Sequence, residues 1–125
     1  MKSAIQLAML ALAGILGAPL VAVAQNYPAK TVRVVVPWPP GGSNDIVARL
    51  VAQKLAENTG QQFIIDNRGG ASGIVGSDLV AKSPADGYTF MIHSTTHVSN
   101  PHLYSKIPYD TMKDFVGVEI GRAHV

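Results

Sequence analysis

A run of β-branched residues that passes directly into a glycine-rich turn constrains this 125-residue chain more than any other feature. Residues 31–36 read Thr-Val-Arg-Val-Val-Val, which is typical of a strand buried on both faces of a parallel sheet. Residues 37–45 then read Pro-Trp-Pro-Pro-Gly-Gly-Ser-Asn-Asp, and apolar residues recur at helical spacing from there to Gly60. A strand, a glycine-rich turn and a helix in this order predict an α/β fold, and a helix start of this kind is a candidate anion site or a plain structural turn.

The remainder of the chain repeats this alternation. Ser43 or Asn44 is expected to cap the first helix, and a second strand is predicted at 62–66. A second helix is predicted at 74–82. Its buried side would consist of Ile74, Val75, Leu79 and Val80.

A third strand is predicted at 88–93, followed by a polar loop at 94–100. Strands that alternate with helices in this way predict an open, parallel-rich sheet with flanking helices. Ligands of such sheets bind beyond the carboxyl ends of the strands. The three loops that leave those ends, 37–45, 67–73 and 94–100, are rich in Gly, Ser, Thr and Asn, which donate hydrogen bonds without bringing a fixed catalytic charge.

The first 24 residues are expected to be an export signal. Lys2 supplies a positive start, 4–23 is apolar apart from one glutamine, and small residues then favour cleavage between Ala24 and Gln25. A membrane anchor is the alternative, although two glycines and a proline interrupt the run. The chain contains no cysteine, so neither a lipid attachment site nor a disulfide framework is available.

Charge patterning argues against nucleic acid as a partner. The formal net charge is +2, and the lysines and arginines are scattered singly along the chain. Surfaces that follow a phosphate backbone usually cluster such residues beside aromatic platforms.

Several ordered motifs together resemble one known family. They are Tyr-Pro at 27–28, Val-Val-Val-Pro-Trp-Pro-Pro-Gly-Gly-Ser-Asn-Asp-Ile-Val-Ala-Arg at 34–49, Asn-Arg-Gly-Gly-Ala-Ser-Gly at 67–73, Ala-Asp-Gly-Tyr-Thr at 85–89, and Asn-Pro-His-Leu-Tyr, Pro-Tyr-Asp and Lys-Asp-Phe within 100–115. In these motifs the chain resembles the tripartite tricarboxylate transporter substrate-binding proteins, also called the Bug family of periplasmic solute receptors. The resemblance extends from Tyr27 to about Val118.

The resemblance implies a fold like that of type II periplasmic binding proteins. It implies a periplasmic receptor, not an enzyme, that closes about a hinge on a small carboxylate such as a di- or tricarboxylate, an acidic amino acid or an aromatic acid. Such a receptor delivers its ligand to membrane-embedded transporter subunits. It is expected to be a monomer that needs no cofactor and no metal.

The resemblance also implies a set of ligand-binding residues. Carried over by position, the set comprises Trp38, Gly41, Gly42, Ser43 and Asp45 in the first loop, Gly70 and Ala71 in the second, and Thr95, Thr96 and Asn100 in the third. Trp38 departs from the phenylalanine expected at its position. Asp45 would repel an anionic ligand, so ligand contact and stabilisation of the helix start remain alternative roles for it.

The chain is shorter than the family pattern. Members are roughly two to three times as long, so 25–119 is expected to form the N-terminal lobe, with the second domain missing. Residues 120–125 depart from the family pattern and are expected to be a non-native tail. Such a truncation would leave the fragment weakly active or inactive.

Other functions remain as alternatives. Three histidines, His93, His97 and His102, lie near serines, which suggests a secreted hydrolase, but the chain has no G-x-S-x-G elbow. The same histidines are candidate metal ligands or ordinary loop and core residues. The glycines at 70, 73 and 76 are wrongly spaced for a dinucleotide site and favour a turn with close helix packing. A secreted structural domain that binds no ligand is the third alternative.

Overall fold

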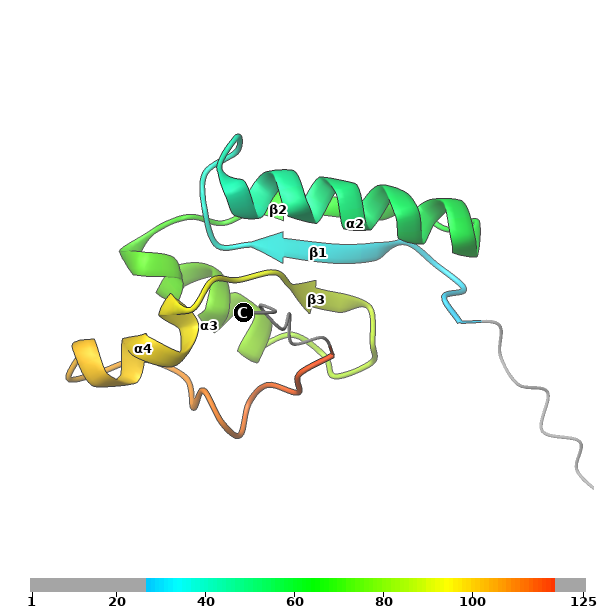
Figure 1. The fold of residues 1–125 in the computed structure, drawn as a ribbon. Helices are drawn as coiled ribbons and strands as arrows, with labels where there is room; N and C mark the ends of the chain where they lie inside the picture. The colour runs from blue at the N-terminus through cyan, green and yellow to red at the C-terminus, as the bar shows by residue number, and fades with distance from the viewer. Residues whose placement is uncertain (1–26, 119–125) are drawn as a thin grey trace, which may run out of the picture.

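A computed structural model describes residues 27–118 of the chain (Figure 1). The predicted signal at 1–24 and the predicted tail at 120–125 lie outside these residues. Among the residues described, no helix is both long and apolar enough to cross a membrane.

The sheet has three parallel strands in the order β2-β1-β3. The first strand, β1 (Val32–Val36), lies between β2 (Phe63–Asn67) and β3 (Thr89–Met91). Its valines are at most 4% exposed, because the strand is paired on both edges and covered on both faces. The predicted α/β fold with a parallel sheet is therefore confirmed.

Helices lie on both faces of this sheet. Figure 1 shows α2 (Ser43–Thr59) along one face, with α3 (Ile74–Ala81) and α4 (Thr96–Leu103) on the other side. The first crossover joins β1 to β2, and the second passes through the short turn η1 (Ala71–Gly73) and α3 to β3. This arrangement brings the loops after all three strands to one edge of the sheet.

Small side chains, not large ones, seat the helices on the sheet. Ala48 and Ala52 of α2 are 0% and 5% exposed, whereas Leu50 is 61% exposed. In α3 the buried residues are Gly76 and Ser77, so the prediction that Val75 lies on the buried side is wrong. Small residues allow the helix backbone to approach the sheet closely, and the large apolar groups then lie on the flanks.

The prediction of a polar loop at 94–100 is also wrong, because α4 begins within it. The Ser94 carbonyl accepts a hydrogen bond from the His97 amide. The Thr95 carbonyl accepts hydrogen bonds from the amides of Val98 and Ser99. Pro101 lies inside this helix, and Asn100, on the buried face of the same helix, is 0% exposed. Tertiary packing of one helix face outweighs the low helix propensity of Thr, Ser, Asn and Pro.

Candidate functional site

The first loop ends in a helix start that has no side-chain cap. Gly42 is the N-cap residue of α2 and makes no capping hydrogen bond, so the prediction that Ser43 or Asn44 caps the helix is wrong. The amide of Ile46 donates to the Gly42 carbonyl at 3.0 Å. Within 27–118 no acceptor is found for the three preceding amides, those of residues 43–45. A helix start with free N–H groups is an electropositive surface for an anion.

Asp45 is buried and fully engaged by the protein itself. Its side chain is 3% exposed; one oxygen accepts hydrogen bonds from the Gly41 amide and from Arg49 Nε, both at 2.9 Å. The other oxygen accepts Asn67 Nδ2 at 2.9 Å. These bonds, that from Arg49 above all, hold the pKa of the Asp45 carboxyl well below its usual range.

We call Gly41, Asp45, Arg49 and Asn67 the Asp45 corner. Asn67 also donates to the Trp38 carbonyl at 3.1 Å, so the corner ties the first loop to the end of β2. Arg49 and Asn67 were not among the site residues predicted from the sequence. The spacing of four residues between Asp45 and Arg49 was the available signal for the first of them.

The second loop turns in a left-handed sense. Gly70, Ala71, Ser72 and Gly73 have φ angles of 136°, 47°, 55° and 86° in succession. The Gly73 amide donates to the Gly70 carbonyl at 3.0 Å, whereas the amides of Ala71 and Ser72 have no acceptor within 27–118. Two non-glycine residues in this conformation carry strain, which persists where the surroundings fix the backbone.

Close packing explains the glycines of this loop. A Cβ atom on Gly73 would lie 2.4 Å from His93 Nε2, and one on Gly76 would lie 2.8 Å from Cβ of Pro37. The interpretation of these glycines as a turn with close helix packing is confirmed.

Residues of α4 and of the position after it support the second loop by hydrogen bonds to Ser72. Asn100 is 0% exposed, and its Nδ2 donates to the Ser72 carbonyl at 3.1 Å. The Ser72 and Tyr104 hydroxyls are hydrogen-bonded at 2.7 Å. Asn100 therefore supports the turn and does not lie on an open surface. Thr95 is exposed and Thr96 is partly exposed, and their amides have no acceptor within 27–118.

Aromatic rings form a layer under the three loops, which we call the histidine layer: Trp38, His93, His97, Tyr109 and Phe115. Ring centroids are 5.9 Å apart for Trp38 and His93 and 5.1 Å apart for His93 and His97. His97 also contacts Tyr109 and Phe115. Trp38 Nε1, His93 Nε2, His97 Nδ1 and the Tyr109 hydroxyl are buried without a partner in the described residues.

The residues predicted to bind ligand lie in the three segments that leave this edge of the sheet. Trp38, Gly73 and His97 are linked through His93, and Gly41, Gly42, Ser43, Gly70, Ala71 and Thr95 are exposed. Asp45 and Asn100 are instead buried supports. Arg68 is bonded to Asp66 at 2.8 Å, and its side chain is half exposed.

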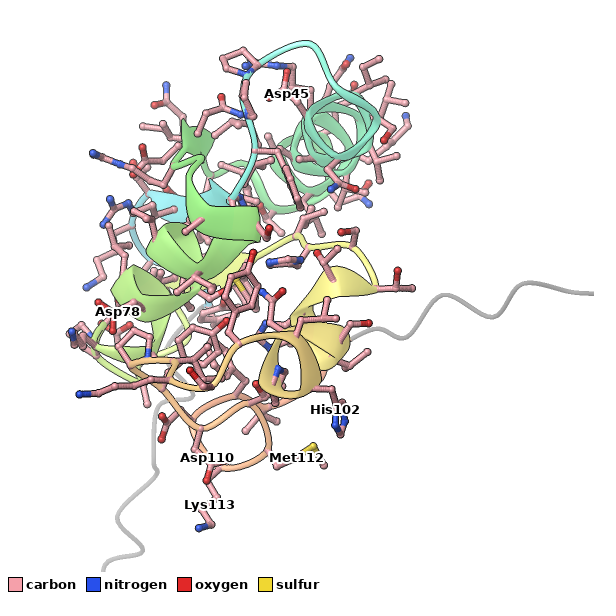
Figure 2. The ribbon with its side chains drawn as sticks, turned by 90° about the vertical axis from the view of Figure 1, so that its left-hand side faces the viewer. Asp45, Asp78, His102, Asp110, Met112 and Lys113 are labelled. Carbon is pink, nitrogen blue, oxygen red and sulfur yellow. The ribbon has the colours of Figure 1, made fainter. Side chains whose placement is uncertain are left out.

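Two surface hollows are lined by residues outside the predicted ligand-binding set. One of about 530 Å³ is lined by Pro101, Tyr109 and the segment around Asp110, and one of about 510 Å³ lies between α2 and β2. Figure 2 shows Asp45 at the opposite end of the lobe from Asp110, Met112 and Lys113.

Within the described residues no group of three or more His, Cys, Asp or Glu side chains is arranged to hold a metal ion. The candidate site is thus an open rim of backbone donors.

The family model described as the tripartite tricarboxylate transporter family receptor matches residues 47–123, more than half of the chain. The chain belongs to this receptor family. The members of this family are receptors, so membership does not support the alternative of a secreted hydrolase.

Relatives share the described region but are much longer than this receptor chain. A UPF0065 protein encoded in the tcbD-tcbE intergenic region of a Pseudomonas species is 48% identical over 92 residues, covering 74% of this chain and 27% of that protein. Protein BugT of Bordetella pertussis is 42% identical over 99 residues, covering 78% and 30%. The chain thus spans less than a third of the length of these relatives.

Solved structures agree with the fold. An R. palustris protein solved with adipate is 46% identical with a TM-score of 0.66, over 69% of this receptor chain and 29% of that protein. MatC from Rhodopseudomonas palustris, solved with bound malate, is 40% identical with the same TM-score of 0.66, over 71% and 31%. The predicted membership of the Bug-type receptors is confirmed.

Proposed function

We propose that 25–119 forms a carboxylate-binding lobe of a periplasmic solute receptor, in which the segments after β1, β2 and β3 receive one carboxylate group. The observation that carries this proposal is that three sets of backbone amides without an acceptor in the described residues belong to the segments that leave one edge of the sheet: the start of α2, the left-handed turn at 70–73, and the start of α4. A carboxylate accepts several such N–H groups at once, and charge-assisted hydrogen bonds of this kind are the strong ones. Neighbours solved with adipate and malate support this class of ligand.

The proposed site consists of Trp38, the exposed residues of the first loop, Gly70, Ala71, Thr95 and Thr96, with Asp45 and Asn100 as supports. The receptor is proposed to be exported with cleavage between Ala24 and Gln25. It would then pass its ligand, as a monomer, to membrane-embedded transporter subunits. The family description supports the transporter partner.

Binding by this lobe is expected to be weak. Micromolar affinity requires about 8 kcal/mol. Three or four charge-assisted hydrogen bonds of about 1.5 to 3 kcal/mol each must first offset an association cost of at least about 4 kcal/mol. An open rim also leaves the contacts screened by water. We therefore expect a dissociation constant for malate well above micromolar, and a submicromolar value would contradict this estimate.

Gly42→Val tests the site without disturbing the fold. Gly42 has φ −79° and ψ 170°, which valine adopts readily, and an added Cβ would meet only the Pro39 carbonyl oxygen at 3.8 Å. The side chain would instead cover the amides at the start of α2. We expect malate affinity, measured by NMR titration, to fall at least about tenfold while stability falls by about 1 kcal/mol, because valine is a poorer N-cap residue than glycine.

Gly60→Ala is the matched control. Gly60 has φ +70° at the other end of α2, with open space around it. Alanine there should reduce stability by about 1 kcal/mol through backbone strain and leave malate binding unchanged. Equal affinity of wild type and Gly42→Val would contradict the proposed site. Absence of any carboxylate binding by the wild type would favour the structural-domain alternative.

A further inference from the structure

His93 lies where the three segments of the proposed site meet. It follows β3, and the Ile92 amide before it still donates to the Val35 carbonyl of β1 at 3.0 Å. The edge of its ring faces Trp38 of the first loop, and its Nε2 lies against Gly73 of the second loop. The ring of His97, in α4, is 5.1 Å away.

The hydrogen bonds of His93 define a neutral ring. The Ser94 amide donates to Nδ1 at 2.8 Å, a shorter contact than the 3.1 Å to the Ser94 carbonyl, which favours a lone pair on Nδ1 and the single ring proton on Nε2. Burial is the main cause that lowers the pKa of His93, and the neighbouring His97 lowers it further. His97 is the titratable side chain that faces this ring from α4. The first loop contributes Trp38 and the second contributes Gly73, and neither carries a charge.

Cations elsewhere near the strand ends are already paired. Within 27–118 all three arginines bond to carboxylates: Arg33 and Arg68 to Asp66, and Arg49 to Asp45. A bound carboxylate would therefore meet amide dipoles without a free positive side chain among these arginines. A charge placed in a partly buried site favours an opposite charge on a neighbouring titratable group. His93 is positioned to supply that charge.

Ser94 provides the structural link between ligand and ring. Its amide is occupied by His93 Nδ1 in the free lobe. A carboxylate at the start of α4 that took this amide would remove the donor from Nδ1 and leave that nitrogen free to bind a second proton. Two acceptors are already near that nitrogen, the Ser94 carbonyl at 3.1 Å and the Thr96 hydroxyl at 3.4 Å.

We propose that His93 is the charge-balancing residue of the carboxylate site, neutral in the free lobe and doubly protonated as imidazolium in the bound one. Capture of a carboxylate then takes up one proton from solvent, which forms an N–H bond at Nδ1 while Nε2 keeps its own proton. This inference rests on the proposed function and adds a basis for selectivity. Anionic carboxylates gain from the imidazolium, whereas the corresponding amides do not.

NMR titration of the histidine rings in the full chain, with and without malate, tests the proposal. The free His93 should titrate below the ordinary value of 6.5, and malate should raise its midpoint by at least about one unit. Between the two midpoints malate affinity should fall about tenfold per pH unit as pH rises, because the bound state holds the extra proton. Calorimetry in buffers of different ionisation enthalpy should show uptake of about one proton in this range. Binding of malate with an unmoved His93 midpoint would overturn the proposal.

Variants separate His93 from the other histidines. His93→Gln keeps an N–H donor but cannot titrate, so its malate affinity should be weak and independent of pH. His102→Gln is the matched control, because His102 is exposed at the outer end of α4 and should keep the wild-type slope (Figure 2). A slope that survives in His93→Gln but disappears in His97→Gln would overturn the assignment. Should His93→Gln fail to fold, the wild-type ring titration decides alone.

The same experiments distinguish the two proposals. Malate binding that is blocked by Gly42→Val but shows no proton uptake leaves the proposed function intact and overturns the role of His93. If the wild type binds malate at no pH, the proposed function fails and the role of His93 fails with it.

Discussion

The Asp45 corner and the histidine layer both contact the first loop and differ in how their polar atoms are satisfied. In the corner, both oxygens of Asp45 accept hydrogen bonds, and Arg49 and Asn67 donate them. In the histidine layer, Trp38 Nε1 and His93 Nε2 are buried without a partner within the described residues. A satisfied network fixes one arrangement, whereas unsatisfied buried groups store free energy that a rearrangement can release. The corner therefore sets the shape of the first loop, and the layer is where a response to ligand is expected.

The largest effect on stability should come from Gly73→Ala, which introduces a steric clash between the second loop and the histidine layer. The added Cβ would lie 2.4 Å from His93 Nε2, on a backbone with φ +86°. Overpacking and strain together should lower the melting temperature by roughly 15 °C. Thermal unfolding followed by circular dichroism measures this. Gly60→Ala has a similar φ and open space, so it isolates the strain and should lose about a third as much. Equal losses in the two variants would mean that His93 yields freely.

Asp45→Asn should have the next largest effect, because it places an amide nitrogen among donors. The Gly41 amide and Arg49 Nε would lose a charged acceptor. We expect a melting temperature lower by roughly 10 °C at neutral pH. Asp78→Asn is the matched control, since Asp78 has one ion pair with an exposed lysine in α3 (Figure 2). If both variants lose the same stability, the corner is no more rigid than a surface pair.

The pH dependence of the stability difference between wild type and Asp45→Asn tests the direction in which the fold shifts the Asp45 pKa. The folded-state pKa of Asp45 lies below its unfolded value, so its contribution is complete above the unfolded pKa of about 4. The contribution is lost as pH falls below that value toward the folded pKa. The stability difference between wild type and Asp45→Asn should therefore be constant from pH 5 to 7 and shrink below about 4, as measured by denaturant unfolding.

Asn100→Ala should have the smallest effect of the three. It removes the bond to the Ser72 carbonyl, but it also removes Asn100 Oδ1, a buried acceptor without a partner in the described residues. The two changes partly cancel, so the melting temperature should fall by only roughly 5 °C. Its effect on malate affinity should be larger in proportion, because the left-handed turn loses its support. A loss as large as that of Asp45→Asn would mean that the turn at 70–73 depends on Asn100 as strongly as the first loop depends on the Asp45 corner.

Much of the fold follows from local sequence patterns. The run at 31–36 gives β1, and the helical spacing up to Gly60 gives α2, whose C-cap is Gly60 in the left-handed region. The third strand is shorter than predicted, although Tyr88 and Ile92 still bond to β1 beyond its ends. These elements were predictable because each depends on period and on turn residues within its own segment.

Tertiary contacts decided the features that the sequence patterns did not predict. The start of α4 lies in a stretch with poor helix formers, and the burial of Asn100 under Ser72 is a contact between segments 28 residues apart. The buried side of α3 follows from how closely Gly76 approaches Pro37, which periodicity does not encode. The meeting of the three loops was predictable from strand order, but the support roles of Asp45 and Asn100 were not, because they depend on partners in other elements.

The left-handed turn at 70–73 has a consequence for how this lobe can change over generations. Ala71 and Ser72 hold φ angles that glycine adopts without strain, so glycine at either position would relieve about 1 kcal/mol or more. The same change would let the backbone sample other shapes and lose the fixed direction of its amides. A lineage selected only for heat tolerance should accumulate glycine there, whereas one selected for fixed amide directions should keep the side chains. The residue type at these two positions should therefore reflect which demand has prevailed.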